Sequence, residues 1–418
     1  SAMGAGSFAS KSVRRNQLFW LITIELLVAL IGGLLGLAAF VSFTYTDIFK
    51  FVLLGSTASI GFFVGMEIPL VIYLLKNIED LKVTLANVLA ADYIGSLGGS
   101  LIFPFVMIPH LGLTRSGIVA AVANIIIAQI LIWKFKPILK KSWKFLAAFS
   151  IVCFGLLIVT YVKSTDWVSH MEDSLYEDKI VYAEQSKYQR IIITRWQKDT
   201  RLYLNGHLQF SSADEYRYHE ALVHVPMSLA KSHEKVLVLG GGDGLAIREL
   251  LKYKDCREIT LVDLDPSVTK IFSRNPILTS LNNNAFANEK VKVINTDAFH
   301  YLKSCKDRYD VIICDLPDPG EPALAKLYSK TFYGLAFKQL KEGGKLVSQS
   351  TSPFRSREAF WCIHNTMRSL KTVEGKHMEM LPYHVLIPTF GTWGFNIASK
   401  EPIDSSKIKV TVPCRYLN

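Results

Sequence analysis

Residues 236–250 read VLVLGGGDGLAIREL and decide the fold of the C-terminal half of this 418-residue chain. An apolar run typical of a buried strand leads into a turn with four glycines, Gly240, Gly241, Gly242 and Gly244, and a helix-like pattern follows. Glycines at such a turn let the backbone approach a ligand closely at a helix start, although they can also form a mere tight connection. Asp243 is unusual in a phosphate cradle, because a carboxylate repels phosphate. The turn therefore favours a ligand that carries positive charge.

The strand-then-helix pattern repeats outward from this turn. EITLVDLD leads into PSVTKIF, VKVINTD leads into AFHYLKSC, and both YDVIICDLPDP and GGKLVSQS add strand-like runs. This alternation predicts a Rossmann-like, doubly wound domain with a parallel sheet over residues 215–418. Before it, short β-rich runs broken by turn residues, Asn205-Gly206 among them, predict a small antiparallel β-domain over residues 175–214.

Acidic residues stand where the second and third predicted strands end. Asp263 ends the second strand, 19 residues after Gly244, where an acid commonly binds ribose hydroxyls. Asp297 ends the third strand and is placed to contact an adenine edge. Each acid alone could instead cap the following helix. Together with Asp243, they predict a nucleoside site.

Two further acids, Asp315 and Asp318, close the fourth strand in the stretch RYDVIICDLPDPGEPAL, residues 308–324. Pro317, Pro319 and Pro322 stiffen the loop that carries them. A carboxylate can accept a proton from an attacking ammonium group or hold that group in place. Either acid alone could be a helix cap or a turn residue, but the pair predicts a second, cationic substrate.

The N-terminal half differs in composition, because it holds nearly all the long apolar runs. About five segments are long enough to cross a bilayer, and they cover residues 18–43, 49–75, 85–108, 116–133 and 145–162. They predict a multi-span α-helical membrane domain over residues 17–163 that contacts the lipid bilayer. Residues 1–16 are interpreted as a vector-derived remnant, SAMGAGS, followed by a basic leader, and are excluded from the predicted fold.

The net charge of +11 comes largely from basic loops beside the apolar segments. That distribution suits anionic lipid headgroups, and no basic-aromatic patch indicates a nucleic-acid partner. The six cysteines show no paired spacing, so neither a disulfide framework nor a metal site is expected. The chain is expected in the cell membrane. The Lys and Arg residues place the C-terminal half outside if there are five spans, whereas a cytosolic co-substrate requires it inside, so the side stays open.

The region 180–399 resembles the spermidine synthases, or polyamine aminopropyltransferases, in the branch with an N-terminal multi-span membrane domain. The resemblance rests on YQRI, LYLNGHLQFSSADEYRYHEALVHVP, VLVLGGGDG, YDVIICDLPDP and IPTFGTWGF, which occur in family order and spacing. It implies transfer of an aminopropyl group from decarboxylated S-adenosylmethionine to putrescine or a related amine. It also implies a homodimer with no permanently bound cofactor.

The resemblance further implies roles for individual residues. Asp315 would be the general base, and Asp318 would anchor the amine. Asp243 would bind the aminopropyl ammonium, and Asp263 the ribose. The remaining implied positions are the adenine contacts Asp297 and Ala298, the nucleoside-pocket residues Gln189, Gly240, Gly242 and Pro322, and Tyr218 and His219 beside the amine channel.

Three positions depart from the family pattern and leave the amine acceptor open. Asn205 replaces an aspartate, Phe390 replaces a tyrosine, and Glu321 adds a charge after the second acid. Two alternatives also stay open. An S-adenosylmethionine-dependent methyltransferase would share the sheet and the glycine turn, but it leaves Asp243 and the acid pair without a role. A non-catalytic membrane polyamine sensor would retain the fold as a binding module.

Overall fold

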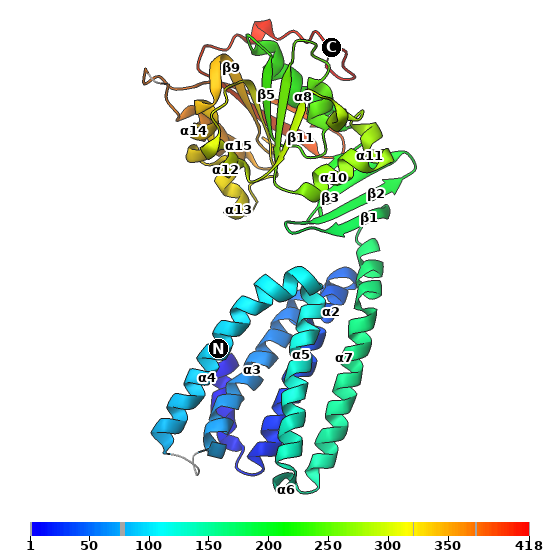
Figure 1. The fold of residues 1–418 in the computed structure, drawn as a ribbon, viewed down its shortest axis with the longest axis vertical. Helices are drawn as coiled ribbons and strands as arrows, with labels where there is room; N and C mark the ends of the chain where they lie inside the picture. Colours follow the sequence, from blue (N-terminus) through cyan, green and yellow to red (C-terminus); the bar gives the residue numbers. More distant parts are fainter. Residues whose placement is uncertain (1, 76–79, 321, 373, 418) are drawn as a thin grey trace. The chain divides into compact units, whose positions relative to one another are not determined.

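The computed structural model describes residues 2–75, 80–320, 322–372 and 374–417. The chain forms two compact units that meet between Glu177 and Asp178, and each has a hydrophobic core of its own. The first unit is helical, and the second contains both β-sheets (Figure 1). Glu321, one of the departures from the family pattern, lies outside the described residues.

Long apolar helices build the first unit. Its elements are α1 (Ala2–Ala9), η1 (Ser10–Ser12), α2 (Gln17–Tyr45), α3 (Phe49–Leu75), α4 (Leu81–Ile102), η2 (Phe103–Met107), α5 (Ile108–Lys134), α6 (Lys136–Leu139) and α7 (Ser142–Asp173). The main core lies where α2, α5 and α7 pack together, and it includes Ile22, Ile125 and Leu157. Many large apolar side chains elsewhere on these helices stay exposed. This distribution is the one expected of helices surrounded by lipid.

The described part of the chain has four helical stretches that are long and apolar enough to cross a membrane. One of them, Leu81–Lys134, has 54 residues, more than twice the roughly 20 that one crossing needs, and it contains two of the five predicted segments. The π-helical turn η2 joins α4 to α5 within this stretch, so the number of about five spans stays a prediction. The stretch bends at Gly112, whose φ of 74° is not helical.

Residues near the N-terminus form a helix in the structure. Helix α1, which lies in the stretch interpreted as a vector remnant and basic leader, packs against α3, and that interpretation stays a prediction. The contact is backbone on backbone: a Cβ on Gly6 would stand 1.8 Å from the carbonyl oxygen of Phe62, and one on Gly65 would stand 2.1 Å from that of Met3. Small residues therefore permit this close approach.

The second unit opens with a four-stranded antiparallel sheet in the order β1-β2-β3-β4. Its strands are β1 (Lys179–Gln185), β2 (Arg190–Trp196), β3 (Asp199–Leu204) and β4 (His207–Ser211). Asn205 and Gly206 both have positive φ and make the tight turn between β3 and β4. Ile191, Leu202 and Phe210 pack beneath α10 and α11 in one core cluster with Phe272.

The larger sheet has seven strands in the order β10-β11-β9-β8-β5-β6-β7. The strands are β5 (Lys235–Gly240), β6 (Glu258–Asp263), β7 (Val291–Asn295), β8 (Tyr309–Asp315), β9 (Leu340–Gln349), β10 (Glu379–Ile387) and β11 (Gly391–Ser399). Strands β5 to β9 are parallel, as predicted, but β11 pairs antiparallel with both β9 and β10. The purely parallel sheet is therefore wrong at this edge, because Gly391, with φ of 85°, turns the chain straight back from β10.

Helices cover both faces of this sheet. They are α8 (Glu215–Leu229), α9 (Leu245–Leu250), α10 (Pro266–Arg274), α11 (Pro276–Leu281), α12 (Ala298–Ser304), α13 (Pro322–Ala325), α14 (Lys330–Lys338) and α15 (Arg357–Arg368). Strand β5 turns Val236 and Val238 toward the core under α8 and α9, and Leu237 and Leu239 toward the core under α12 and α14. The strand order reverses beside β5, with β6 on one side and β8 on the other, so ligands are expected at the carboxyl ends of these strands.

Candidate active site

The glycine turn after β5 lies against two of the predicted acids. Gly240 has φ of 82°, and a Cβ there would stand 2.0 Å from the carbonyl oxygen of Asp315. A Cβ on Gly242 would stand 2.7 Å from Oδ2 of Asp263. Glycine is therefore required at both positions, because the turn must fit between the ends of β6 and β8.

Backbone groups hold Asp263 at the end of β6. Its Oδ2 accepts a hydrogen bond from Gly242 N at 3.1 Å, and its Oδ1 accepts one from Asp265 N at 2.9 Å. Burial raises its pKa to about 6 despite these bonds. The helix cap of α10 is Asp265, whose side chain accepts from Ser267 N. The alternative that Asp263 serves only to cap the following helix is therefore wrong, because Asp265 caps α10.

Asp243 lies in the glycine turn and is half-buried. Its Oδ1 accepts a hydrogen bond from Leu245 N at 2.9 Å, and Asn282 Nδ2 donates to its backbone oxygen at 2.9 Å. Burial raises its pKa to about 6; the charge on His219 opposes that rise and the charge on Asp315 adds to it. Because the charge on a neighbouring acid raises the pKa of Asp243, a cation beside Asp243 would stabilise its ionised form.

Asp315 ends β8 and has one close side-chain partner. Tyr218, from α8, donates a hydrogen bond of 2.6 Å to its Oδ1. Burial raises the pKa of Asp315 above its usual range, although the charge on His219 and the Tyr218 hydrogen bond both lower it. Burial likewise holds the pKa of Tyr218 well above its ordinary value, so the phenol stays a donor. Asp315 is thus an oriented carboxylate suited to accepting a proton.

Asp318 is oriented by a buried glutamine. Gln349 Nε2 donates to Asp318 Oδ1 at 3.2 Å, and the other end of the same amide accepts from Trp393 Nε1 at 3.2 Å. Phe390 packs edge-on against Trp393, with ring centroids 5.6 Å apart. Burial raises the pKa of Asp318. The departure at residue 390 is therefore linked to Asp318 through two side chains.

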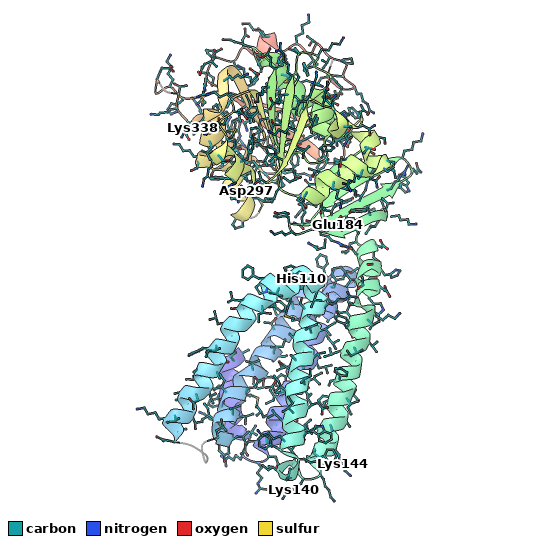
Figure 2. The ribbon with its side chains drawn as sticks, in the orientation of Figure 1. His110, Lys140, Lys144, Glu184, Asp297 and Lys338 are labelled. Carbon is teal, nitrogen blue, oxygen red and sulfur yellow. The ribbon has the colours of Figure 1, made fainter. Side chains whose placement is uncertain are left out.

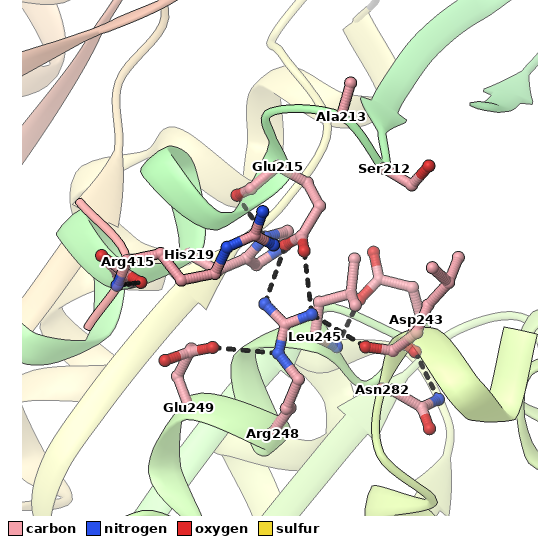
Figure 3. A network of polar contacts seen from close by, with 12 residues as sticks. Ser212, Ala213, Glu215, His219, Asp243, Leu245, Arg248, Glu249, Asn282 and Arg415 are labelled. Carbon is pink, nitrogen blue, oxygen red and sulfur yellow. Dashed lines mark hydrogen bonds and ion pairs between the residues drawn. The ribbon is translucent and has the colours of Figure 1, made fainter. Parts of the chain in front are cut away.

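A charged network lies behind the acids (Figure 3). His219 Nδ1 is 2.8 Å from Glu215 Oε2, and Arg248 binds Glu215 with two hydrogen bonds of 2.8 and 2.9 Å. Burial lowers the pKa of His219, but the hydrogen bond and charge of Glu215 prevail and raise it to about 9. His219 is thus held as a buried cation on the helix that also carries Tyr218.

Asp297 has a different environment from the other acids. It caps α12 by accepting from His300 N at 3.0 Å, and Lys326 Nζ lies 2.7 Å from its Oδ2. Burial opposes the effect, but the Lys326 hydrogen bond lowers the pKa of Asp297 below its usual range. A ligand at this carboxylate must therefore compete with Lys326. Ala298, the next residue, is buried in the core under α12.

The other predicted positions lie around this edge of the sheet. Gln189 Nε2 donates to Asp265 Oδ2 at 3.0 Å, which ties the turn before β2 to the start of α10. Pro322 is the exposed first residue of α13. Asn205 accepts a hydrogen bond from Arg190 N at 2.9 Å, so that departure from the family pattern serves a turn.

Three residues of this arrangement were missed by sequence reasoning. Gln349 stands at the end of β9, and Glu215 and Arg248 belong to different helices. Glu215 had a signal, because it lies four residues before His219 and so on the same helix face. Arg248 and Gln349 had none, since their partners are distant in the sequence.

A doubly wound sheet with acids at or just beyond the carboxyl ends of β5, β6 and β8 defines a class, the Rossmann-like proteins that bind a ligand at this edge. A family model described as spermine/spermidine synthase domain matches residues 215–409. A polyamine aminopropyltransferase of Leptospira interrogans is 42% identical over 406 residues, which is 97% of this chain and 80% of that protein. One of Oceanobacillus iheyensis is 40% identical over 428 residues, covering 100% of this chain and 81% of that one.

Among solved structures, a crystal structure of spermidine synthase in complex with the transition state analogue AdoDATO is similar in fold. The TM-score is 0.52 at 28% identity, over 58% of this chain and 83% of that one. The chain belongs to the polyamine aminopropyltransferase family. It is an aminopropyltransferase, and this membership decides against the methyltransferase and sensor alternatives.

Proposed function

We propose that the site transfers the aminopropyl group of decarboxylated S-adenosylmethionine to putrescine. The observation that carries the proposal is that Asp243 and Asp315 both lie at the glycine turn: Asp243 belongs to the turn, and a Cβ on Gly241 would stand 3.0 Å from Oδ2 of Asp315. Burial raises the pKa of both carboxyl groups. The co-substrate has an ammonium and a sulfonium group, and the acceptor has two amino groups. Each positive charge that enters this site lowers the cost of keeping the acids ionised.

In the proposed reaction, a neutral amine nitrogen attacks the aminopropyl carbon bound to sulfur. A C–N bond forms as the C–S bond breaks, and the sulfonium leaves as neutral methylthioadenosine. The proton that the amine must lose goes to Asp315, which Tyr218 holds in place at 2.6 Å. Fixing nucleophile and electrophile in this way supplies much of the rate enhancement in a displacement reaction.

The remaining acids would position the two substrates. Asp243 would pair with the ammonium of the aminopropyl group, and Asp263 would accept from the ribose hydroxyls. Asp318, held by Gln349, would bind the distal ammonium of the amine. Asp297 with Ala298 would contact the adenine after Lys326 is displaced. Gln189 and Pro322 are proposed to line the nucleoside pocket, and His219 to border the amine channel.

The acceptor is tested by mass spectrometry on detergent-purified protein. The protein receives decarboxylated S-adenosylmethionine with putrescine, cadaverine or spermidine in separate reactions. We expect methylthioadenosine with every accepted amine and the highest kcat/KM for putrescine. Preference for another amine would refute putrescine specificity, and no aminopropyl product with any amine would refute the proposed reaction.

We also propose that the helical unit is inserted in the cell membrane. In the described part of the chain, four helical stretches of 27 to 54 residues are apolar enough to cross it, and side chains such as Phe51 and Ile94 are exposed on them. Such helices resist extraction by alkaline carbonate, so the chain should remain in the membrane pellet. Recovery in the supernatant would refute insertion.

The side of the membrane is measurable with a cysteine-reactive maleimide that does not cross membranes. Cys362 is the exposed cysteine in the described part of the chain, whereas Cys414 is partly buried and its thiol donates to Val412 O. Cys362 is thus the better reporter. Labelling only after the cells are opened would place the catalytic unit inside, where the co-substrate is expected to be made.

A further inference from the structure

An apolar groove of about 720 Å³ runs along the outside of the helical unit between α5 and α7. Its walls are Ile125, Ile126, Gln129, Ile130, Trp133 and Lys134 from α5, and Ile151 and Phe154 from α7. Several of these side chains are open to the surroundings, among them Trp133 at 70%, Ile151 at 65% and Ile130 at 59% exposure. These side chains form a continuous apolar wall on the outside of α5 and α7.

The groove offers few polar contacts along its length. Gln129 Nε2 donates to Ser150 Oγ, and Ser150 Oγ in turn donates to Ala147 O at 2.9 Å. This glutamine is therefore partnered within the helix pair, and the remaining walls up to Trp133 are hydrocarbon. The groove suits an apolar chain rather than a polar ligand.

One end of the groove is strongly basic. Five lysines occupy the last residue of α5, the α5–α7 connection and the first turn of α7: Lys134, Lys136, Lys140, Lys141 and Lys144. Figure 2 shows Lys140 and Lys144 together at this end of the helical unit. Within residues 2–75, 80–320, 322–372 and 374–417, no carboxylate forms an ion pair with any of the five.

Aromatic rings lie at the end of the groove where the lysines stand. Lys136 Nζ stands 4.0 Å from the ring centroid of Trp143 and 5.8 Å from that of Trp133. Tryptophan is enriched at the depth of the lipid headgroups, where an apolar ring and a polar edge are both satisfied. The order along α5 is therefore hydrocarbon, aromatic, cation, which is also the order of environments met on leaving a bilayer.

We propose that this groove binds an anionic phospholipid, with an acyl chain along α5 and its phosphate against Lys134 and Lys136. The span from Ile125 to Lys134 is about 13 Å at 1.5 Å per residue, close to the roughly 15 Å depth of one leaflet. The proposal rests on the membrane insertion proposed above. It assigns the helical unit a lipid-specific contact in addition to anchoring.

Charge argues against the other occupants. A second copy of this chain on the groove would bring two five-lysine clusters together, and like charges repel. Free phosphate would pair with the lysines but leave the hydrocarbon walls uncovered. A zwitterionic lipid would fill the groove without compensating the lysines, so the anionic lipid satisfies both parts of the surface.

The test measures lipid retention by native mass spectrometry, with dioleoyl phosphatidylglycerol and dioleoyl phosphatidylcholine as probes with identical chains. We expect phosphatidylglycerol to bind at least tenfold more tightly. A lysine near an anionic surface contributes roughly fivefold to affinity, so Lys134→Gln with Lys136→Gln should lower phosphatidylglycerol binding about 30-fold. The matched control is Lys11→Gln with Lys82→Gln, two lysines outside the groove, which should leave it unchanged.

A second variant tests the hydrocarbon part. Ile130→Trp should fill the groove and lower retention of both lipids at least tenfold, whereas Ile94→Trp, an exposed position on α4, should not. Equal retention of the two lipids, or equal losses in test and control variants, would overturn the lipid site. If carbonate extracted the chain from membranes, insertion itself would be refuted, so the two failures are distinguishable.

Discussion

Tyr218→Phe removes one hydroxyl group and leaves the ring in place. In the structure that hydroxyl donates a 2.6 Å hydrogen bond to Asp315 Oδ1. The ring stays anchored by packing on Phe395, with centroids 5.3 Å apart. The substitution therefore tests whether the tyrosine sets the proton affinity of the proposed base.

The size of the effect follows from the charge of the acceptor. A hydrogen bond to a charged group contributes about 1.5–3 kcal/mol, and 1.36 kcal/mol corresponds to one pKa unit. The bond stabilises the ionised carboxylate, so its loss should raise the pKa of Asp315 further, by about 1 to 2. The acidic limb of the kcat/KM profile should move to higher pH by the same amount. At a pH below the shifted limb, activity should fall roughly 10- to 100-fold, with a smaller loss on the alkaline plateau.

The assay is methylthioadenosine release between pH 5.5 and 9, measured by chromatography at limiting putrescine. The matched control is Tyr301→Phe, which also removes a hydroxyl from a 2.6 Å hydrogen bond, in this case to Tyr309. Its profile should keep the wild-type acidic limb. A uniform loss at every pH in Tyr218→Phe, with no displacement of the limb, would refute the proposed coupling.

Three further substitutions test other parts of the site. Asp243→Asn should lower the affinity for decarboxylated S-adenosylmethionine about 10- to 100-fold but the affinity for methylthioadenosine less than threefold, and equal losses in calorimetry would contradict its role. The affinity of the wild type for the co-substrate should likewise fall as the pH drops through about 6, because Asp243 is then protonated. Glu220→Gln should lower the Tm by about 5 °C or more, because the buried carboxylate accepts three backbone hydrogen bonds from residues 415–417. The control Glu289→Gln, at an exposed position, should keep the wild-type Tm, and equal Tm values for the two variants would refute this role of Glu220. Phe390→Tyr adds a hydroxyl beside Trp393 and should change the ratio of kcat/KM between putrescine and cadaverine, whereas an unchanged ratio would place residue 390 outside the channel.

Much of the acidic edge of the larger sheet could be predicted, because parallel strands bring their last residues to the same edge. Asp263 and Asp315 end β6 and β8, and Asp243 lies three residues after the end of β5, so the strand boundaries bring them together. Gly240 and Gly242 were expected to approach a ligand. The structure adds that their bare backbone also accommodates the neighbouring acids.

Contacts between residues distant in the sequence could not be predicted. Arg248 meets Glu215 across 33 residues, and Lys326 meets Asp297 across 29. Neither pair has a periodicity that a single sequence reveals. The alternative that Asp297 is a helix cap is correct in the structure, since it does cap α12. A cap and a ligand contact are compatible, because a carboxylate has two oxygens.

The helical unit shows the same limit. Hydropathy located the apolar segments, but it could not show that the π-helical turn η2 joins α4 to α5, because its residues 103–107, FPFVM, are as apolar as the helices beside them. Composition alone also could not show that the small residues of α1 pack against α3, where Gly6 and Gly65 permit the close contact.

The central claim is that Asp315 takes the proton of the attacking amine, and Asp315→Asn tests it most directly. The amide keeps the shape of the side chain but cannot accept that proton. In single-turnover reactions with putrescine, the account predicts at least a 1,000-fold loss of aminopropyl transfer, with methylthioadenosine affinity within threefold of wild type. Transfer within tenfold of wild type, in a variant that still binds methylthioadenosine, would contradict the claim.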